Sequence, residues 1–172
     1  MEVIMMKKSK LKNQKKKWIL FGTSAVVIVI IAVLTLATGN NSEPTAVETN
    51  ATGQLVINKA DITKTASFYP YESNGTYMEI IAVRANDDTV RTALNTCQVC
   101  YNSGRGYYEQ LGDKLICNNC GNQFTIDQIE RIKGGCNPVP ILDEMKTEDI
   151  ETITIDPEYL VAFEPLFTNW KR

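Results

Sequence analysis

Five cysteines are the residues of this sequence whose types and spacing are best suited to chemistry. Cys97-Gln98-Val99-Cys100 is followed, after sixteen residues, by Cys117-Asn118-Asn119-Cys120. In a Cys-x-x-Cys turn the backbone N–H groups point at the sulfurs, and two such turns joined by a hairpin can bring four thiolates to one tetrahedral point. This spacing is typical of a metal site. It predicts one metal centre with the ligands Cys97, Cys100, Cys117 and Cys120.

The sequence leaves the occupant of this site open. An exported domain would also permit the same cysteines to form disulfides. Four thiolates suit Zn²⁺, a single iron or an iron–sulfur cluster. Cys136, in the segment Gly134-Gly135-Cys136-Asn137-Pro138, is a fifth cysteine. It is either a spare thiol in a tight loop or a redox partner or alternate ligand close to the centre.

Composition excludes several functional classes. The chain has no histidine, so Ser-His-Asp triads, Cys-His nucleophile pairs and His-ligated metals are ruled out. From residue 41 onward eleven Lys and Arg stand against nineteen Asp and Glu, a charge balance poorly suited to nucleic acid. The sequence shows no glycine-rich phosphate loop and no positioned nucleophile. A metal-binding or electron-transfer accessory protein is therefore favoured over an enzyme.

An apolar segment near the N-terminus predicts a membrane anchor. Residues 18–38 are uncharged, and a helix of this length spans about 30 Å, the thickness of a bilayer core. Seven lysines precede it within residues 1–17, which places the N-terminus in the cytoplasm by the positive-inside rule. A cleaved signal peptide is the alternative, although signal-peptide apolar regions are usually shorter. Both interpretations place the remaining chain outside the cytoplasm.

The exported part is expected to be mostly β. Asn74-Gly75 is a strong hairpin signal between strands at 66–72 and 76–84, and Gly112-Asp113 joins strands at 107–111 and 114–117. Asp156-Pro157 is typical of a helix N-terminus. The remaining expected strands are 54–59, 89–94, 124–126 and 153–155, with a solvated acidic turn at 86–88. The predicted organisation is a Lys-rich cytoplasmic tail at 1–17, a transmembrane helix at 18–38, a linker at 39–53 and a metal-binding domain at 54–172.

The cysteine-containing segment resembles a known family. The stretches VRTALNTCQVCYNSGRGYYEQLGDKLICNNCGNQFTI and GGCNPVPI are similar to the membrane iron–sulfur-containing, FtrD-like domain family. The similarity covers about residues 55–155. It implies an iron–sulfur centre held by Cys97, Cys100, Cys117 and Cys120, with Cys136 at a family position of unclear role. It also implies a place in bacterial high-affinity iron uptake, beside a permease or periplasmic metal-handling proteins.

A wider similarity concerns the fold. The two cysteine boxes look like those of a Rieske domain in which Cys100 and Cys120 replace both histidines, and segment 134–140 would cover the cluster. A Rieske-like or rubredoxin-like β domain is therefore expected. Export favours another occupant of the site, because iron–sulfur proteins are usually exported already folded, behind a twin-arginine signal. No arginine precedes Arg84, which favours zinc or a single iron.

These observations support one leading hypothesis and two alternatives. The leading one is a membrane-anchored, extracytoplasmic electron-transfer accessory of a bacterial iron-uptake system. The first alternative is a structural zinc module that docks a membrane partner, and such a module would unfold when the metal is chelated. The second is a thiol–disulfide exchange protein in which Cys136 resolves one of the cysteine pairs, which requires a thiol of low pKa.

Overall fold

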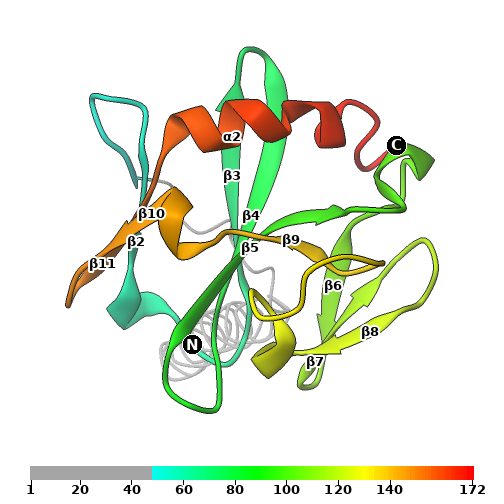
Figure 1. The fold of residues 1–172 in the computed structure, drawn as a ribbon, viewed down its shortest axis with the longest axis horizontal. Coiled ribbons are helices and arrows are strands. Elements are labelled where there is room, and N and C mark those ends of the chain that lie inside the picture. The colour runs from blue at the N-terminus through cyan, green and yellow to red at the C-terminus, as the bar shows by residue number, and fades with distance from the viewer. Residues whose placement is uncertain (1–47) are drawn as a thin grey trace, which may run out of the picture. The chain divides into compact units, whose positions relative to one another are not determined.

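Three antiparallel sheets form within residues 48–172, the part of the chain that the computed structural model describes (Figure 1). The first has the order β1-β2-β11-β10, with bounds Glu48–Thr49, Leu55–Asn58, Thr152–Ile155 and Lys146–Glu148. The second has the order β3-β4-β5-β9, with bounds Ser67–Ser73, Thr76–Arg84, Val90–Cys97 and Pro138–Pro140. The third has the order β6-β7-β8, with bounds Tyr108–Leu111, Lys114–Cys117 and Gln123–Thr125.

The helices of the described residues are short. The α-helix α2, Pro157–Phe163, continues into a 3₁₀ helix, η5, at Glu164–Phe167. The other 3₁₀ turns are η1 Lys59–Asp61, η2 Tyr101–Ser103, η3 Ile126–Gln128 and η4 Asp143–Met145. In residues 48–172 no helix is long and apolar enough to cross a membrane. The tail predicted at 1–17, the anchor predicted at 18–38 and most of the predicted linker lie outside the described residues.

The predicted hairpins are confirmed. β3 pairs with β4 so that Ser73 faces Thr76 across Asn74 and Gly75. These two residues have φ angles of 48° and 80°, as a two-residue turn between twisted strands requires. β4 pairs with β5 around the acidic turn, and β6 pairs with β7 across Gly112 and Asp113. The mostly β prediction therefore holds for the described residues.

Three strands were not expected. β1 lies inside the segment predicted as a linker, and Glu48 and Thr49 pair with Val56 and Leu55 of β2. β9 contains Pro138 and Pro140, which have no N–H to donate and therefore obscure a strand in the sequence. β9 is nonetheless tolerated because it lies at an edge, next to β5. β10, the third of these strands, is an edge strand of the first sheet, beside β11.

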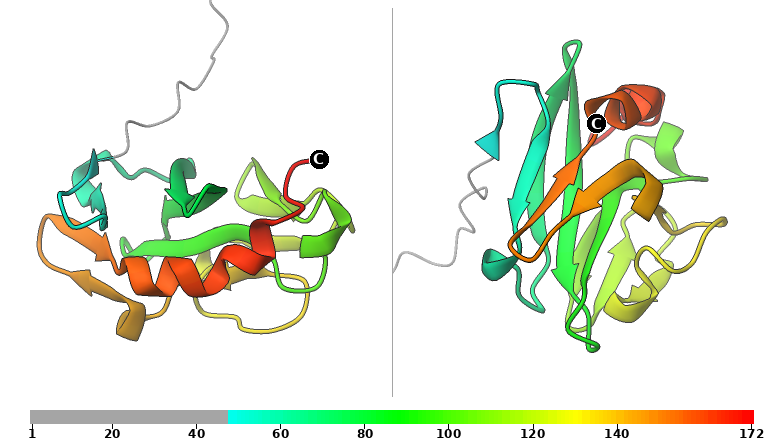
Figure 2. Two further views of the ribbon diagram at one scale, coloured as in Figure 1. Left: turned by 90° about the horizontal axis from the view of Figure 1, so that it is seen from above. Right: turned by 60° about the vertical axis from the view of Figure 1, so that its left-hand side comes forward.

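Two apolar cores lie on opposite sides of the central strands. Because strand side chains alternate between faces, Ile80 and Ala82 of β4 belong to the first core, and Ile81 and Val83 belong to the second. The first core is shared with β2, β11 and the C-terminal helices. The second contains residues of β7 and η3, and Cys97. Figures 1 and 2 show β10–β11 and the β6–β8 sheet at opposite ends, with β4 and β5 between them.

The predicted helix N-terminus is also confirmed. The Asp156 side chain accepts a hydrogen bond from the backbone N–H of Glu158, and Pro157 is the first helical residue. Tyr159 of α2 is buried, and its hydroxyl donates to the carbonyl of Pro140 at 2.8 Å. The C-terminal helices are therefore attached to β9, the strand that follows Cys136.

Candidate metal centre

Three segments that are distant in the sequence meet at one end of the second core. Cys97 is the last residue of β5, and Cys117 is the last residue of β7. Cys136 lies in the loop that leads into β9, where Pro138 pairs with Cys97. The ends of two strands and the start of a third thus bring all three cysteine-bearing segments together.

Each Cys-x-x-Cys segment forms a tight turn held by a backbone N–H hydrogen bond. The backbone N–H of Cys100 donates to the Sγ of Cys97 at 3.2 Å. In the second turn the N–H of Gly121 donates to the carbonyl of Cys117 at 2.8 Å. Gly121 has a φ of 73°, a conformation in which glycine is favoured. The first turn places Cys97 and Cys100 in the second core, and the second turn places Cys117 there.

The five sulfurs lie around a volume suited to one metal centre. The Sγ atoms of Cys97, Cys100, Cys117 and Cys136 all lie within 4.8 Å of one another. The Cys136 Sγ is 3.1 Å from that of Cys97, 3.6 Å from that of Cys100 and 2.7 Å from that of Cys120. At a metal–sulfur distance of about 2.3 Å, tetrahedral ligands would lie about 3.8 Å apart. A donor set made only of sulfur fits zinc, iron or an iron–sulfur cluster.

Burial divides the thiols into two groups. Cys97 and Cys117 are fully enclosed by the second core, and Cys100 is also buried. Cys120 is exposed, and Cys136 is partly exposed. The centre therefore has a protected inner side and one side that reaches solvent.

The environment sets the protonation of these thiols. Burial opposes ionisation of Cys97, but interactions with the Tyr108 side chain and the Cys100 backbone amide outweigh it and hold the pKa of Cys97 below its ordinary value. Burial raises the pKa of Cys117 to about 11. Burial, together with the neighbouring Cys120 thiol, also raises the pKa of Cys136. Because metals bind thiolates, metal binding at this site must release protons.

A glycine allows the first cysteine turn to pack against the chain that returns to it. The carbonyl of Gly106 accepts a hydrogen bond from the N–H of Cys97 at 2.7 Å. A Cβ at Gly106 would lie 2.4 Å from the carbonyl oxygen of Cys100 and 2.7 Å from the backbone nitrogen of Tyr101. These neighbours are backbone atoms, so a residue with a Cβ cannot be accommodated here without displacing the backbone.

Replacing Gly106 with alanine is therefore expected to displace the first cysteine turn. We expect a loss of at least about 2 kcal/mol in the free energy of unfolding, because overpacking against backbone is costly. We also expect weaker metal retention. Urea unfolding and metal analysis measure the two effects.

The matched control is Gly53→Ala, since Gly53 has a φ of 79° but nothing within 4 Å of the added Cβ. It should lose only about 1–2 kcal/mol and keep its metal. Equal losses of unfolding free energy and equal metal retention in the two variants would contradict the role of close packing at Gly106.

Comparison with known proteins identifies the family. Residues 62–167 match the family described as membrane iron-sulfur containing protein FtrD-like. The match covers more than half of the chain. This chain belongs to that family. No curated protein and no solved structure matches it.

The four predicted ligands of this FtrD-like protein lie close together, but they differ in burial and in their distances from one another. Cys97, Cys100 and Cys117 are mutually close and buried, as a common site requires. The fourth member of the closest group is Cys136, which the sequence singled out as an alternate ligand. Cys120 contacts this group through the sulfur of Cys136. The assignment of individual ligands therefore stays a prediction, and Cys136 belongs among the candidates.

Sequence reasoning did not predict the hydrogen bonds that hold the FtrD-like site together. Tyr108 is buried between the two turns, and its hydroxyl donates to the carbonyl of Cys136 at 2.9 Å. The Asn95 side chain accepts from the Tyr108 N–H at 2.7 Å and donates to the carboxylate of Glu79 at 2.5 Å. Trp170 donates to the Asn95 carbonyl at 2.6 Å. No clear signal in the sequence marked Asn95, because β5 also contains the polar residues Arg91, Thr92 and Thr96.

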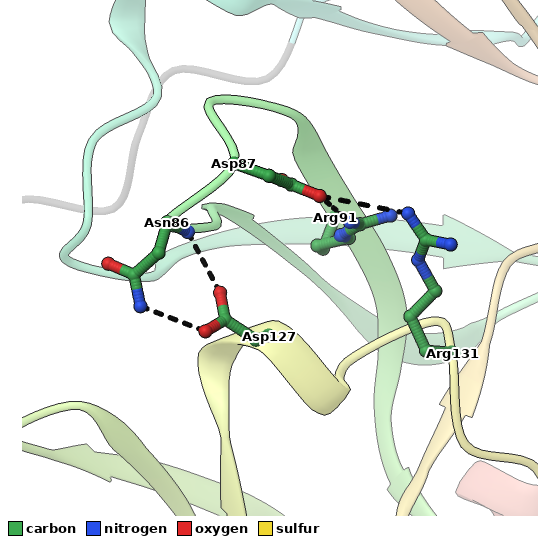
Figure 3. A pocket seen from close by; sticks show the side chains of 5 residues that line it. All are labelled: Asn86, Asp87, Arg91, Asp127 and Arg131. Carbon is green, nitrogen blue, oxygen red and sulfur yellow. Dashed lines mark hydrogen bonds and ion pairs between the residues drawn. The ribbon is translucent and has the colours of Figure 1, made fainter.

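A separate surface pocket of about 550 Å³ lies beside the acidic turn (Figure 3). Its lining residues are Asn86, Asp87, Arg91, Asp127 and Arg131. The Asp87 carboxylate contacts the guanidinium of Arg91 at 2.6 Å and that of Arg131 at 3.7 Å. The carboxylate of Asp127 accepts two hydrogen bonds from Asn86. Both carboxylates are thus engaged in holding η3 and its following segment to the β4–β5 turn.

These contacts predict a pH dependence at Asp127. Its carboxylate accepts from the backbone N–H of Asn86 at 2.8 Å and from its side-chain amide at 2.9 Å, which lowers its pKa. A depressed folded-state pKa stabilises the fold above the unfolded value of about 3.9, and this stabilisation is lost as the pH falls through the folded value. Carboxyl NMR titration should therefore show a low pKa for Asp127. Asn86→Ala should raise it toward the ordinary value, and an unchanged pKa in that variant would contradict this account.

Proposed function

We propose that this chain is a membrane-anchored, extracytoplasmic electron-transfer accessory of a bacterial iron-uptake system. Its thiol site would hold an iron–sulfur cluster or a single iron. The description of the family as membrane iron–sulfur proteins supports this occupant. The sulfur-only donor set supports it independently, because thiolates are the usual ligands of such centres.

The observation that carries the electron-transfer proposal is the one-sided exposure of the cysteine group. Cys97, Cys100 and Cys117 are buried, whereas Cys120 is exposed and Cys136 is partly exposed. The inner thiols would hold an iron centre firmly, and the outer side would let a partner protein approach it. A bound iron–sulfur cluster would supply one-electron redox chemistry.

The proposed setting follows from the N-terminal sequence and the family resemblance. Residues 18–38 would anchor the chain with the N-terminus in the cytoplasm, and the β domain would face the outside. An iron permease or a periplasmic metal-handling protein is the proposed partner. We also propose a Rieske-like arrangement, since the two cysteine turns follow β5 and β7 and segment 134–140 contributes Cys136 to the same site.

Anaerobic purification of the full-length chain in detergent tests this proposal. The expected result is stoichiometric iron with sulfur-to-iron charge-transfer bands that bleach reversibly on chemical reduction. Acid-labile sulfide analysis would distinguish an iron–sulfur cluster from a single iron. A colourless protein without redox-active metal would refute the electron-transfer role.

A structural zinc site is a second candidate, and the burial of the inner thiols favours it. Cys97 and Cys117 are enclosed by apolar side chains of the second core, so a metal there would also stabilise that core. This candidate predicts about one zinc per chain and no colour. It also predicts that a chelator unfolds the domain. Metal analysis and the absorption spectrum of the same purified protein distinguish zinc from an iron centre.

A further inference from the structure

We propose that Cys120 and Cys136 are alternative ligands for one corner of the metal centre, whose other three corners are Cys97, Cys100 and Cys117. This inference rests on the proposed metal-binding function. It adds that the centre has four coordination corners but five thiols, and that the outermost two exchange with each other.

The first argument is the distance between the two sulfurs. The Sγ atoms of Cys120 and Cys136 are 2.7 Å apart. Two ligands of one tetrahedral ion would be separated by about 3.8 Å. The Cys136 sulfur lies closer to that of Cys120 than to those of Cys97 and Cys100, which are 3.1 and 3.6 Å away. Cys120 is therefore the thiol that competes most directly with Cys136 for one corner, and only one of the two at a time can complete a four-coordinate site there.

The second argument is that a different observation supports each of the two sulfurs as the ligand at this corner. The sequence spacing of the second Cys-x-x-Cys turn supports Cys120. The mutual distances support Cys136, which completes the group of four sulfurs within 4.8 Å. Cys136 is also held in place, because the Tyr108 hydroxyl donates to its carbonyl at 2.9 Å.

The third argument is exposure. The three constant ligands are buried, whereas the two exchanging thiols form the side of the site that reaches solvent. In the exchange, a bond from the metal to one of these sulfurs breaks as a bond to the other forms. The incoming thiol loses its proton and the departing thiolate gains one, so that charge and electron count are unchanged. An exposed thiol is then available without emptying the site.

Cobalt substitution tests this inference. The full-length chain is stripped of metal under anaerobic, reducing conditions and titrated with Co²⁺. The intensity of the sulfur-to-cobalt charge-transfer band per bound cobalt rises with the number of thiolate ligands. The variants are Cys120→Ser, Cys136→Ser and the double variant. Each single variant should match the wild-type intensity, and the double variant should lose about one quarter, the share of one thiolate in four.

Other outcomes overturn the inference in distinct ways. A loss in Cys120→Ser alone would make Cys120 the sole fourth ligand, and a loss in Cys136→Ser alone would assign Cys136. Losses in both single variants would mean that both thiols bind at once. A single variant that fails to fold or to bind cobalt also contradicts the exchange, because the remaining thiol should complete the site. Wild-type protein that binds no cobalt would instead refute the metal-binding function itself.

Discussion

Replacing Cys97 with serine is expected to lower the affinity of the full-length chain for its metal by about 100-fold. Cys97 is fully buried, and its sulfur accepts from the Cys100 N–H at 3.2 Å, so serine would remove a soft ligand that the fold holds inside the core. A structural zinc site contributes about 10–16 kcal/mol in total, so that one ligand of four accounts for about 3 kcal/mol. This corresponds to about two orders of magnitude in the dissociation constant.

Competition with a chromophoric chelator measures this loss directly. Val99→Ser is the matched control, because Val99 lies in the same turn with 65% of its surface exposed and faces away from the core. It should retain wild-type affinity. A Cys97→Ser protein that binds metal as tightly as Val99→Ser would remove Cys97 from the ligand set. It would leave the site to the remaining four cysteines.

Replacing Lys146 with methionine is expected to reduce the free energy of unfolding by about 3–5 kcal/mol, because it leaves a buried carboxylate without its partner. The Lys146 Nζ lies 2.9 Å from the Glu130 carboxylate, and their side chains are 2% and 11% exposed. The same carboxylate accepts from the backbone N–H of Thr92 at 2.7 Å. The pair thus joins β10 to β5 and to the segment that leads to Cys136.

Urea unfolding of the full-length chain measures this effect, with two controls. Arg131→Met removes an exposed cation that lies 3.7 Å from Asp87, so it should cost at most about 1 kcal/mol. The double variant Lys146→Met with Glu130→Gln should be less destabilised than Lys146→Met alone, because it removes the buried charge as well. Similar losses for Lys146→Met and Arg131→Met would show that the buried pair contributes no more than a surface contact.

Local features of the domain could be predicted from the sequence because short-range geometry determines them. Asn74 and Gly75 form a hairpin because they tolerate positive φ angles, and Asp156 caps a helix because its side chain reaches the N–H two residues on. The spacing within each Cys-x-x-Cys turn likewise determines that the N–H of Cys100 faces the sulfur of Cys97. Each of these contacts spans only a few residues.

The sequence by itself thus determined most of the strands, the hairpin turns and the five thiols that are available to a metal centre. Only the tertiary structure decided which of those thiols are buried and which lie closest together. Cys136 joins the group because β9 pairs with β5, although its prolines conceal that strand. The two cores and the Lys146–Glu130 pair were equally hidden, since burial on both faces of β4 and contacts across long separations leave no local pattern. Packing between distant segments therefore buried the Cys97 thiol and left the Cys120 thiol exposed.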